Sequence, residues 1–486
     1  MPAAYRFAPL LLSALLATGL AGAQTADNPL LNVSPLPLRY PQFDKLRDEH
    51  FTPALDQGMA EQLAEIQAIA DNPAAPTFEN TILAWEKSGR LLARANTLLS
   101  SLSGADTNPT RQQLQSDYAA RLAAQRDAVL LNPRLFTRVE ALYAARDEAA
   151  PDAEARRLIE RYRRDMVRAG AQLNDEQKAR MKAINAELAT LGARFSKTVL
   201  AEVNESAVVV DRAEELAGLS PAQIAAAADA AKKRGLEGKY LLTLLNTTIQ
   251  PLETELQNRA LRERLHQASV ARGSRGNAND TTALVARVLT LRQERAALLG
   301  HATPADFVLE DETAKTPAAA TALLRQLAPA AVASARQEAA ELQKLIDADQ
   351  AAKGQPSFTL QPWDWSYYAE KLRAAKYGFD EAQLKPYLEI TSVLERGVFF
   401  AAEKLYGIRF KRRTDLPVYR DDVRVYDVFD DNGKQLAIFL ADLYARPSKR
   451  GGAWMPTWAR TRWKVPRPSW PITSTSPSRR PASPRC

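Results

Sequence analysis

Cysteine and histidine are scarce in this chain of 486 residues. The only cysteine is Cys486, and the three histidines are His50, His266 and His301. A single cysteine forms no internal disulfide and supplies no set of thiolates for a zinc site. A helical zinc site needs two histidines four residues apart with a glutamate between them, and no two histidines here lie within 30 residues of each other. We therefore predict structural roles for all three and assign no catalytic and no metal-binding residue.

Nucleophilic and phosphate-binding motifs are also missing from the sequence. The chain contains enough Ser, His and Asp residues for a Ser-His-Asp triad, but no G-x-S-x-G nucleophile elbow supports one. Gly273-Ser274-Arg275-Gly276 is typical of a loop and lacks the lysine and the spacing of a phosphate-binding loop. The sequence thus contains no self-contained catalytic constellation.

No apolar run is long enough to cross a membrane. The apolar stretch from Ala8 to Leu20 follows Arg6 and precedes Ala21-Gly22-Ala23, a pattern typical of a secretory signal peptide cleaved before Gln24. We therefore expect residues 1–23 to be a signal peptide. The mature protein is expected to be exported, in a bacterium to the periplasm, without a membrane anchor.

The last 28 residues contain no Asp, Glu, Leu or Gly, but six Arg, one Lys, six Pro and five Ser. Together with Arg6 they account for the whole net charge of +8, so residues 24–458 are roughly neutral and a nucleic-acid partner is not expected. A folded domain rarely changes composition so abruptly. We interpret residues 459–486 as a basic, out-of-frame-like tail.

Residues 24–458 are predicted to form one mainly α-helical body, because no internal stretch has the composition of a linker. Apolar residues from Pro53 to Ile69 recur every three or four positions, which predicts an amphipathic helix. Thr77 and Asn80 are candidate helix caps. The stretch from Glu154 to Lys197 predicts two helices separated at residues 170–174.

Strand signals are few and mostly late. Val208-Val209-Val210 is a short β-branched run. Residues 423–429 and 436–444 flank Asp430-Asp431-Asn432-Gly433, whose Asn-Gly pair favours a tight hairpin turn.

Two segments carry residue types found in binding surfaces. The aromatic cluster from Trp363 to Tyr368 is more typical of a packed corner than of a binding surface. Gly451 and Gly452, followed by Ala453, Trp454 and Met455, would allow a strand to approach a peptide substrate closely. A plain turn explains this second segment equally well.

Several segments, in order, resemble the thimet oligopeptidase family of zinc metallopeptidases, and most closely its peptidyl-dipeptidase (dipeptidyl carboxypeptidase) branch. They include PTFENTILAWEKSG at 76–89, FVLEDETAKTP at 307–317, WDWSYYAEKLRAAKYGFDEAQLKPYLEI from Trp363, and a final run from KLYGIRF to GGAWM that ends at Met455. The resemblance covers residues 28–458.

The resemblance implies a large, two-lobed helical body with a channel that admits short peptides, and an enzyme that releases C-terminal dipeptides. It also implies a zinc ion held by a His-Glu-x-x-His helix and a further glutamate, all of which follow the GGAWM segment in the family. None of these residues can be placed on this sequence. The oligomeric state is left open.

We therefore hypothesise that a frameshift between about Met455 and Pro466 disrupted a peptidyl-dipeptidase. The expected product has an incomplete second lobe, poor packing beyond about residue 320, no bound zinc and no activity. A helical peptide-binding protein that keeps one wall of the channel, and an unrelated helical scaffold, are the alternatives.

Overall fold

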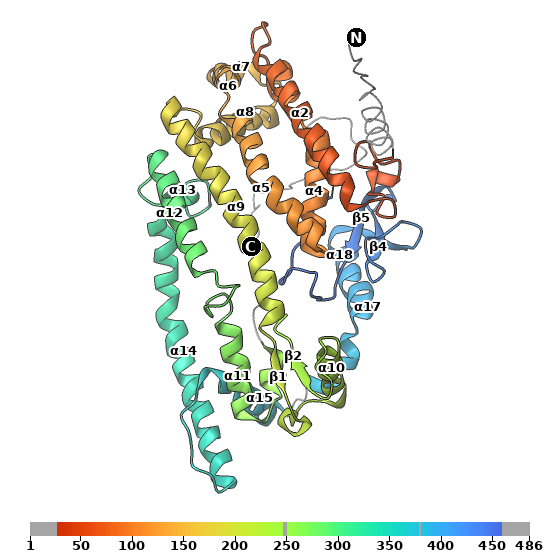
Figure 1. Ribbon diagram of the computed structural model, residues 1–486, viewed down its shortest axis with the longest axis vertical. Helices are drawn as coiled ribbons and strands as arrows, with labels where there is room; N and C mark the ends of the chain where they lie inside the picture. Colours follow the sequence, from red (N-terminus) through yellow and green to blue (C-terminus); the bar gives the residue numbers. More distant parts are fainter. Residues whose placement is uncertain (1–26, 246–249, 379–380, 459–486) are drawn as a thin grey trace, which may run out of the picture.

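The computed structural model in Figure 1 describes residues 27–245, 250–378 and 381–458. The expected signal peptide and the basic tail lie outside the described residues. Most of the described chain is helical, and it contains two small antiparallel sheets, which confirms the mainly α fold with a late hairpin. No helix in these ranges combines the length and the apolar character that a membrane crossing requires.

Helices make up most of the chain, and the strands are short. The α-helices are α2 (Phe51–Ala70), α3 (Ala84–Lys87), α4 (Arg90–Ala105), α5 (Pro109–Leu130), α6 (Pro133–Ala144), α7 (Arg146–Ala149), α8 (Ala153–Ala169), α9 (Asp175–Glu205), α10 (Pro221–Lys232), α11 (Arg259–Val270), α12 (Thr282–Leu298), α13 (Pro304–Leu309), α14 (Pro317–Ala352), α15 (Pro362–Tyr377), α16 (Glu381–Leu384), α17 (Ile390–Ser392) and α18 (Phe399–Tyr406). The strands are β1 (Val208–Val210), β2 (Tyr240–Leu242), β3 (Arg409–Arg413), β4 (Arg424–Phe429) and β5 (Gln435–Ala441). Short 3-10 turns are η1 (Pro37–Arg39), η2 (Asp48–His50), η4 (Ala213–Leu216), η5 (Pro251–Thr254) and η6 (Lys385–Leu388), and π-helical segments are η3 (Phe78–Leu83) and η7 (Val393–Val398).

The helix boundaries follow the capping residues. Thr77 and Asn80 exchange hydrogen bonds, since the Thr77 hydroxyl accepts from the Asn80 amide at 3.1 Å and the Asn80 side chain accepts from the Thr77 amide at 2.9 Å. Helix α8 ends at Gly170, whose φ of 105° is the left-handed conformation that glycine adopts most easily. Asn174 then caps α9. The predicted caps and the prediction of two helices in residues 154–197 are confirmed.

Helix α9 connects the two ends of the molecule. It is 31 residues long and packs along α5 and α12. Figure 1 shows it running from the helices around α8 toward the small sheet of β1 and β2. Strand β1, which was predicted from its three valines, pairs with β2 through Val209 opposite Leu241.

Glu202, in the last turn of α9, fixes the loop at residues 271–281. The residue is 1% exposed. The carboxylate accepts hydrogen bonds from Arg275 at 2.7 and 2.8 Å, from the Gly273 amide at 3.1 Å and from Asn277 at 3.2 Å. The hydrogen bonds, above all those from Arg275, lower the pKa of Glu202 to about 2, although burial alone would raise it. The glycine-rich segment is therefore a clamped structural loop.

Apolar side chains are much more exposed late in the chain than early. In α14, Leu323, Leu324 and Leu327 are between 58% and 66% exposed, and buried residues appear only from Leu342 onward. Around α18, Leu405 and Tyr406 are also largely exposed. The exposed side chains agree with the expected poor packing beyond residue 320 for the first half of α14 and for α18. In contrast, Leu342, Ile346 and Tyr368 form a packed cluster between α14 and α15, and strand β4 is mostly buried.

We predict that Glu202→Gln lowers the free energy of unfolding by about 2–3 kcal/mol, because Arg275 loses its charged partner and the buried acceptors are weakened. Urea titration at pH 7 measures this. Glu205→Gln is the matched control, because Glu205 is exposed on the same helix and accepts one bond, from Asn279. Since folding depresses the pKa of Glu202, its contribution should persist above about pH 4.5 and disappear as the pH falls toward 2. Equal stabilities for both variants would contradict this role.

Candidate peptide-binding region

The sheet of β3, β4 and β5 joins the late part of the chain to the early helices. Strand β4 is central, with Tyr426 opposite Arg412 of β3 and Phe439 of β5. Strands β4 and β5 form the predicted hairpin, which is confirmed. Figure 1 shows this sheet beside α4 and α18.

The two faces of the sheet are both apolar and pack on different elements. Val425, Ile438 and Leu440 belong to the cluster built by α2 and α4, which includes Phe51 and Leu99. On the opposite face Tyr426, Phe410, Phe439 and Ala441 pack against Leu394 of η7 and Phe399 of α18. Side chains alternate between faces along a strand, so this pattern fixes the register of β5.

The two edges of the sheet differ in charge. Strand β3 carries four cations in five residues, Arg409, Lys411, Arg412 and Arg413, whereas β5 carries no charged residue. Charged side chains on an edge strand oppose pairing with another chain. Among the described strands, only β4 pairs with β5. The outer edge of β5 is therefore suited to accept an extended peptide by backbone hydrogen bonds.

The segment that follows β5 is anchored on a half-buried carboxylate, that of Asp442. Asp442 accepts hydrogen bonds from Tyr419 at 2.8 Å, from Arg446 at 2.7 and 2.8 Å and from Lys449 at 3.0 Å. Burial opposes ionisation of this carboxyl group, but the hydrogen bonds from Arg446, Lys449 and Tyr419 outweigh it and lower the pKa of Asp442 to about 2. The carboxylate therefore stays charged and holds two cations at the end of β5.

The same segment is tied to the C-terminal end of α4. The Thr107 amide donates to the carbonyl of Ser448 at 2.8 Å, and the Arg450 amide donates to the carbonyl of Gly104 at 2.9 Å. Arg446 donates to the carbonyl of Ala105. Helix ends leave carbonyl groups without helical partners, and here residues 446–450 supply donors to them.

The segment from Gly451 to Met455 does not form the strand that we considered. Gly452 has a φ of 86°, a turn conformation that interrupts extended backbone. Trp454 is half-buried, with the guanidinium carbon of Arg450 5.0 Å from its ring centre, and Met455 is 84% exposed. Gly451 and Ala453 are exposed. The backbone of this segment is therefore a plain turn, the alternative to a strand. Its contact with a peptide stays a prediction.

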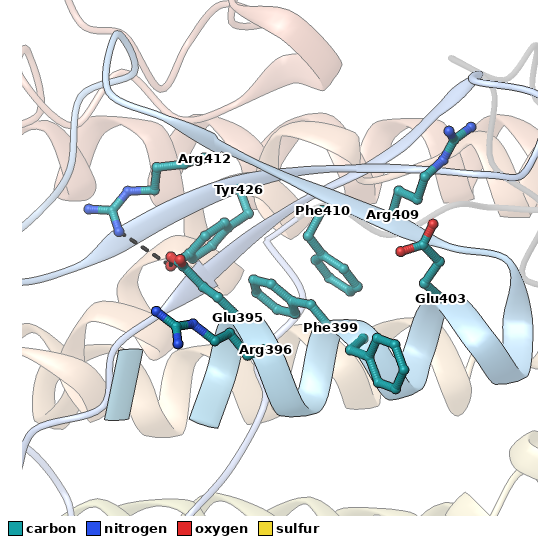
Figure 2. A pocket seen from close by; sticks show the side chains of 9 residues that line it. Glu395, Arg396, Phe399, Glu403, Arg409, Phe410, Arg412 and Tyr426 are labelled. Atoms are coloured by element: carbon teal, nitrogen blue, oxygen red, sulfur yellow. Dashed lines mark hydrogen bonds between the residues drawn. The ribbon is translucent and has the colours of Figure 1, made fainter. Parts of the chain in front are cut away.

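A pocket of about 550 Å³ opens on the face of the sheet that packs against α18, as Figure 2 shows. Phe399 and Phe410 stack in it with ring centres 4.0 Å apart. Tyr426 donates to Glu395 at 3.0 Å, and Arg412 donates to the Tyr426 hydroxyl at 3.3 Å. The full lining is Glu395, Arg396, Phe399, Phe400, Glu403, Arg409, Phe410, Arg412 and Tyr426. An apolar base with charged residues at its rim suits an amphipathic peptide side chain.

The histidines have separate structural environments. His50 accepts from the Arg47 amide at 3.1 Å at the start of the helical region. His266 Nδ1 lies 3.8 Å from Glu253, and His301 Nε2 lies 3.7 Å from Glu310. Within the described ranges, no three His, Cys, Asp or Glu side chains are grouped to hold a metal ion. These residues do not fit the zinc site that the resemblance implies.

Two features of this region were not predicted from the sequence. Strand β3 was missed because its composition, Arg-Phe-Lys-Arg-Arg, is typical of an exposed loop. The Asp442 cluster was missed because Tyr419 lies 23 residues from Asp442 in the sequence, so the contact depends on tertiary packing. The basic character of residues 446–450 was the only available signal.

Comparisons with known proteins identify relatives over most of the chain. Residues 252–482 match the family model described as Peptidase family M3, a range that extends into the basic tail. A dipeptidyl carboxypeptidase of Escherichia coli is 44% identical over 431 residues, which is 89% of this chain and 63% of that protein. The dipeptidyl carboxypeptidase of Salmonella typhimurium is also 44% identical, over 88% of this chain and 62% of its own length. Oligopeptidase A of Escherichia coli is 30% identical over 88% of this chain and 62% of its own length. The chain thus spans somewhat less than two thirds of the length of these relatives.

We predict that Asp442→Asn loosens the segment after β5, because Arg446 and Lys449 lose the charge that holds them. Amide hydrogen exchange over residues 443–452 should accelerate by at least tenfold, consistent with the loss of charge-assisted hydrogen bonds worth about 1.5–3 kcal/mol each. Asp421→Asn is the control, because Asp421 is exposed. If the amides of residues 443–452 exchange equally slowly in Asp442→Asn, the contacts with α4 alone hold this segment in place.

Proposed function

We propose that this chain forms the peptide-facing part of a zinc-dependent peptidyl-dipeptidase, on the basis of the match of residues 252–482 to peptidase family M3 and of the two dipeptidyl carboxypeptidases that it resembles. The collinear 44% identity to two dipeptidyl carboxypeptidases carries this proposal. Release of dipeptides from the C-termini of short peptides is the activity proposed for the complete enzyme. In this chain, the sheet of β3 to β5 and the Asp442-anchored segment supply the surface along which the peptide lies.

The proposal assigns no hydrolytic step to residues 1–486. Zinc would supply the Lewis acid in the complete enzyme, but this sequence has no pair of histidines four residues apart. We therefore propose that the chain by itself binds no catalytic zinc and hydrolyses no peptide. The frameshift hypothesis for residues 459–486 stays a proposal, and sequencing the gene beyond the codon for Trp458 tests it.

Peptide binding without catalysis is the second candidate function. The uncharged outer edge of β5 favours it, because both faces of the sheet contact other elements and, among the described strands, only β4 pairs with β5. The two functions share one surface. They differ in whether a peptide that binds there is cleaved.

The purified chain is expected to bind an N-terminally blocked oligopeptide and to release no dipeptide from it, with or without added zinc. Calorimetry measures the binding and chromatography of the products measures the cleavage. Peptide cleavage that a chelator abolishes would refute the absence of a zinc site.

Chemically modified peptides locate the binding edge. Methylation of alternate backbone amides on the pairing side of the peptide should abolish the binding heat, because strand pairing uses backbone groups. Methylation of the other amides should have little effect. Lys411→Glu, on the exposed β3 edge, is the protein control and should leave binding unchanged. Saturable binding that is insensitive to methylation on either side would argue against strand pairing on β5.

We also propose that the protein is exported, on the basis of the signal-like residues 1–23. N-terminal sequencing of the protein from a periplasmic fraction should begin at Gln24. A protein that retains Met1 and stays in the cytosol would contradict export.

A further inference from the structure

Glu253 is a buried acid with no role in the proposed peptide-binding region. It lies in η5 and is 7% exposed. Its Oε1 atom is buried and has no hydrogen-bond partner among the described residues. The imidazole of His266, on α11, is nearby, with Nδ1 3.8 Å from Oε1. This separation is too long for a hydrogen bond, so the two groups are neighbours without a direct bond.

A second unsatisfied polar atom lies at the same junction. The indole Nε1 of Trp363, on α15, is buried without a hydrogen-bond partner in the described part of the chain. The rings of His266 and Trp363 are 6.1 Å apart, and α15 packs against both η5 and α11. Buried polar atoms normally have partners, so two orphan atoms at one junction of three elements require an explanation.

The nearby arginines are committed to other partners. Arg262 of α11 donates to Asp364 Oδ1 at 2.9 Å and to the carbonyls of Leu256 and Trp363 at 2.8 and 3.1 Å. Arg259 binds the other side of Asp364. The titratable and charged groups around Glu253 are therefore His266 and Arg262 from α11 and, behind Arg262, Asp364 from α15. Because Arg259 and Arg262 share the single charge of Asp364, these three groups keep a net positive charge, but the hydrogen bonds of Arg262 go to other partners and leave Glu253 Oε1 unsatisfied.

Burial of the carboxyl group raises the pKa of Glu253 to about 7, and the charge of Arg262 only partly opposes this shift. The group therefore changes its protonation near neutral pH. Since folding raises this pKa above the ordinary value of 4.5, the neutral acid stabilises the packed junction at low pH. That stabilisation is lost as the pH rises through 7.

We propose that the buried carboxyl group of Glu253, beside the imidazole of His266, is a latch that seats α15, and with it the α14–α15 hairpin, on α11. With a proton on Glu253, the junction stays closed and dry. When that proton is lost, the buried carboxylate draws in water, and the hairpin loosens. This latch is independent of the peptidase assignment, because it involves no residue of β3 to β5.

Amide hydrogen exchange between pH 5.5 and 8, corrected for the intrinsic rate, measures the opening of residues 251–256 and 360–368. In the full chain, the opening constant is expected to rise roughly 30-fold over this range. This follows from a pKa of Glu253 of about 7 in the closed junction and about 4.5 in the open junction. Glu253→Gln mimics the neutral acid and should show no such rise. His266→Gln should open more than the unmodified chain at pH 8, because the imidazole then no longer lies beside the Glu253 carboxylate.

Glu263→Gln is the matched control, because Glu263 lies on α11 and bonds only within that helix, to Gln267. It should keep the full pH dependence. An opening constant that is the same at both pH values in the unmodified chain would overturn the proposal, as would a 30-fold rise that persists in Glu253→Gln. His266→Gln that behaves as the unmodified chain at both pH values would remove His266 from the latch.

Discussion

Packing of a late sheet on early helices is the constraint on which the candidate site depends. Val425 and Leu416 share one core with Phe51 and Leu99, although more than 300 residues separate the two groups in the sequence. This core fixes one face of the sheet, and the small aromatic cluster around Tyr426 fixes the other. Because both faces are occupied, the free edge of β5 is the part of the sheet that is left for a ligand's backbone.

Buried charge then determines where the chain goes after β5. Asp442 gathers Tyr419, Arg446 and Lys449, and the backbone beyond it closes the end of α4. Glu202 plays the same part at the end of α9, and Asp364 does so at the start of α15. Each of these carboxylates has several donors, which compensates for the cost of burying its charge. Glu253 is the exception, and its missing donors are the reason to expect that it responds to pH.

Local signals in the sequence predicted the local structure well. The caps at Thr77 and Asn80, the break at Gly170 and the hairpin turn at Asn432-Gly433 all depend on neighbours in the chain, and all are present. Strand β3 could not be predicted in this way, because pairing with β4 outweighs the loop-like composition of its basic residues. The strand considered at Gly451 and Gly452 is absent because those glycines allow a turn as readily as a strand. The Asp442 cluster depends on contacts that no local pattern encodes.

We propose that an extended peptide adds to the outer edge of β5. Solution NMR of the labelled chain with a blocked oligopeptide tests this most directly, through intermolecular contacts between backbone protons. Such contacts are expected between the peptide and alternate residues of 435–441, in the pattern of a strand pair. Contacts confined to the pocket at Phe399 and Phe410, with none to β5, would contradict it.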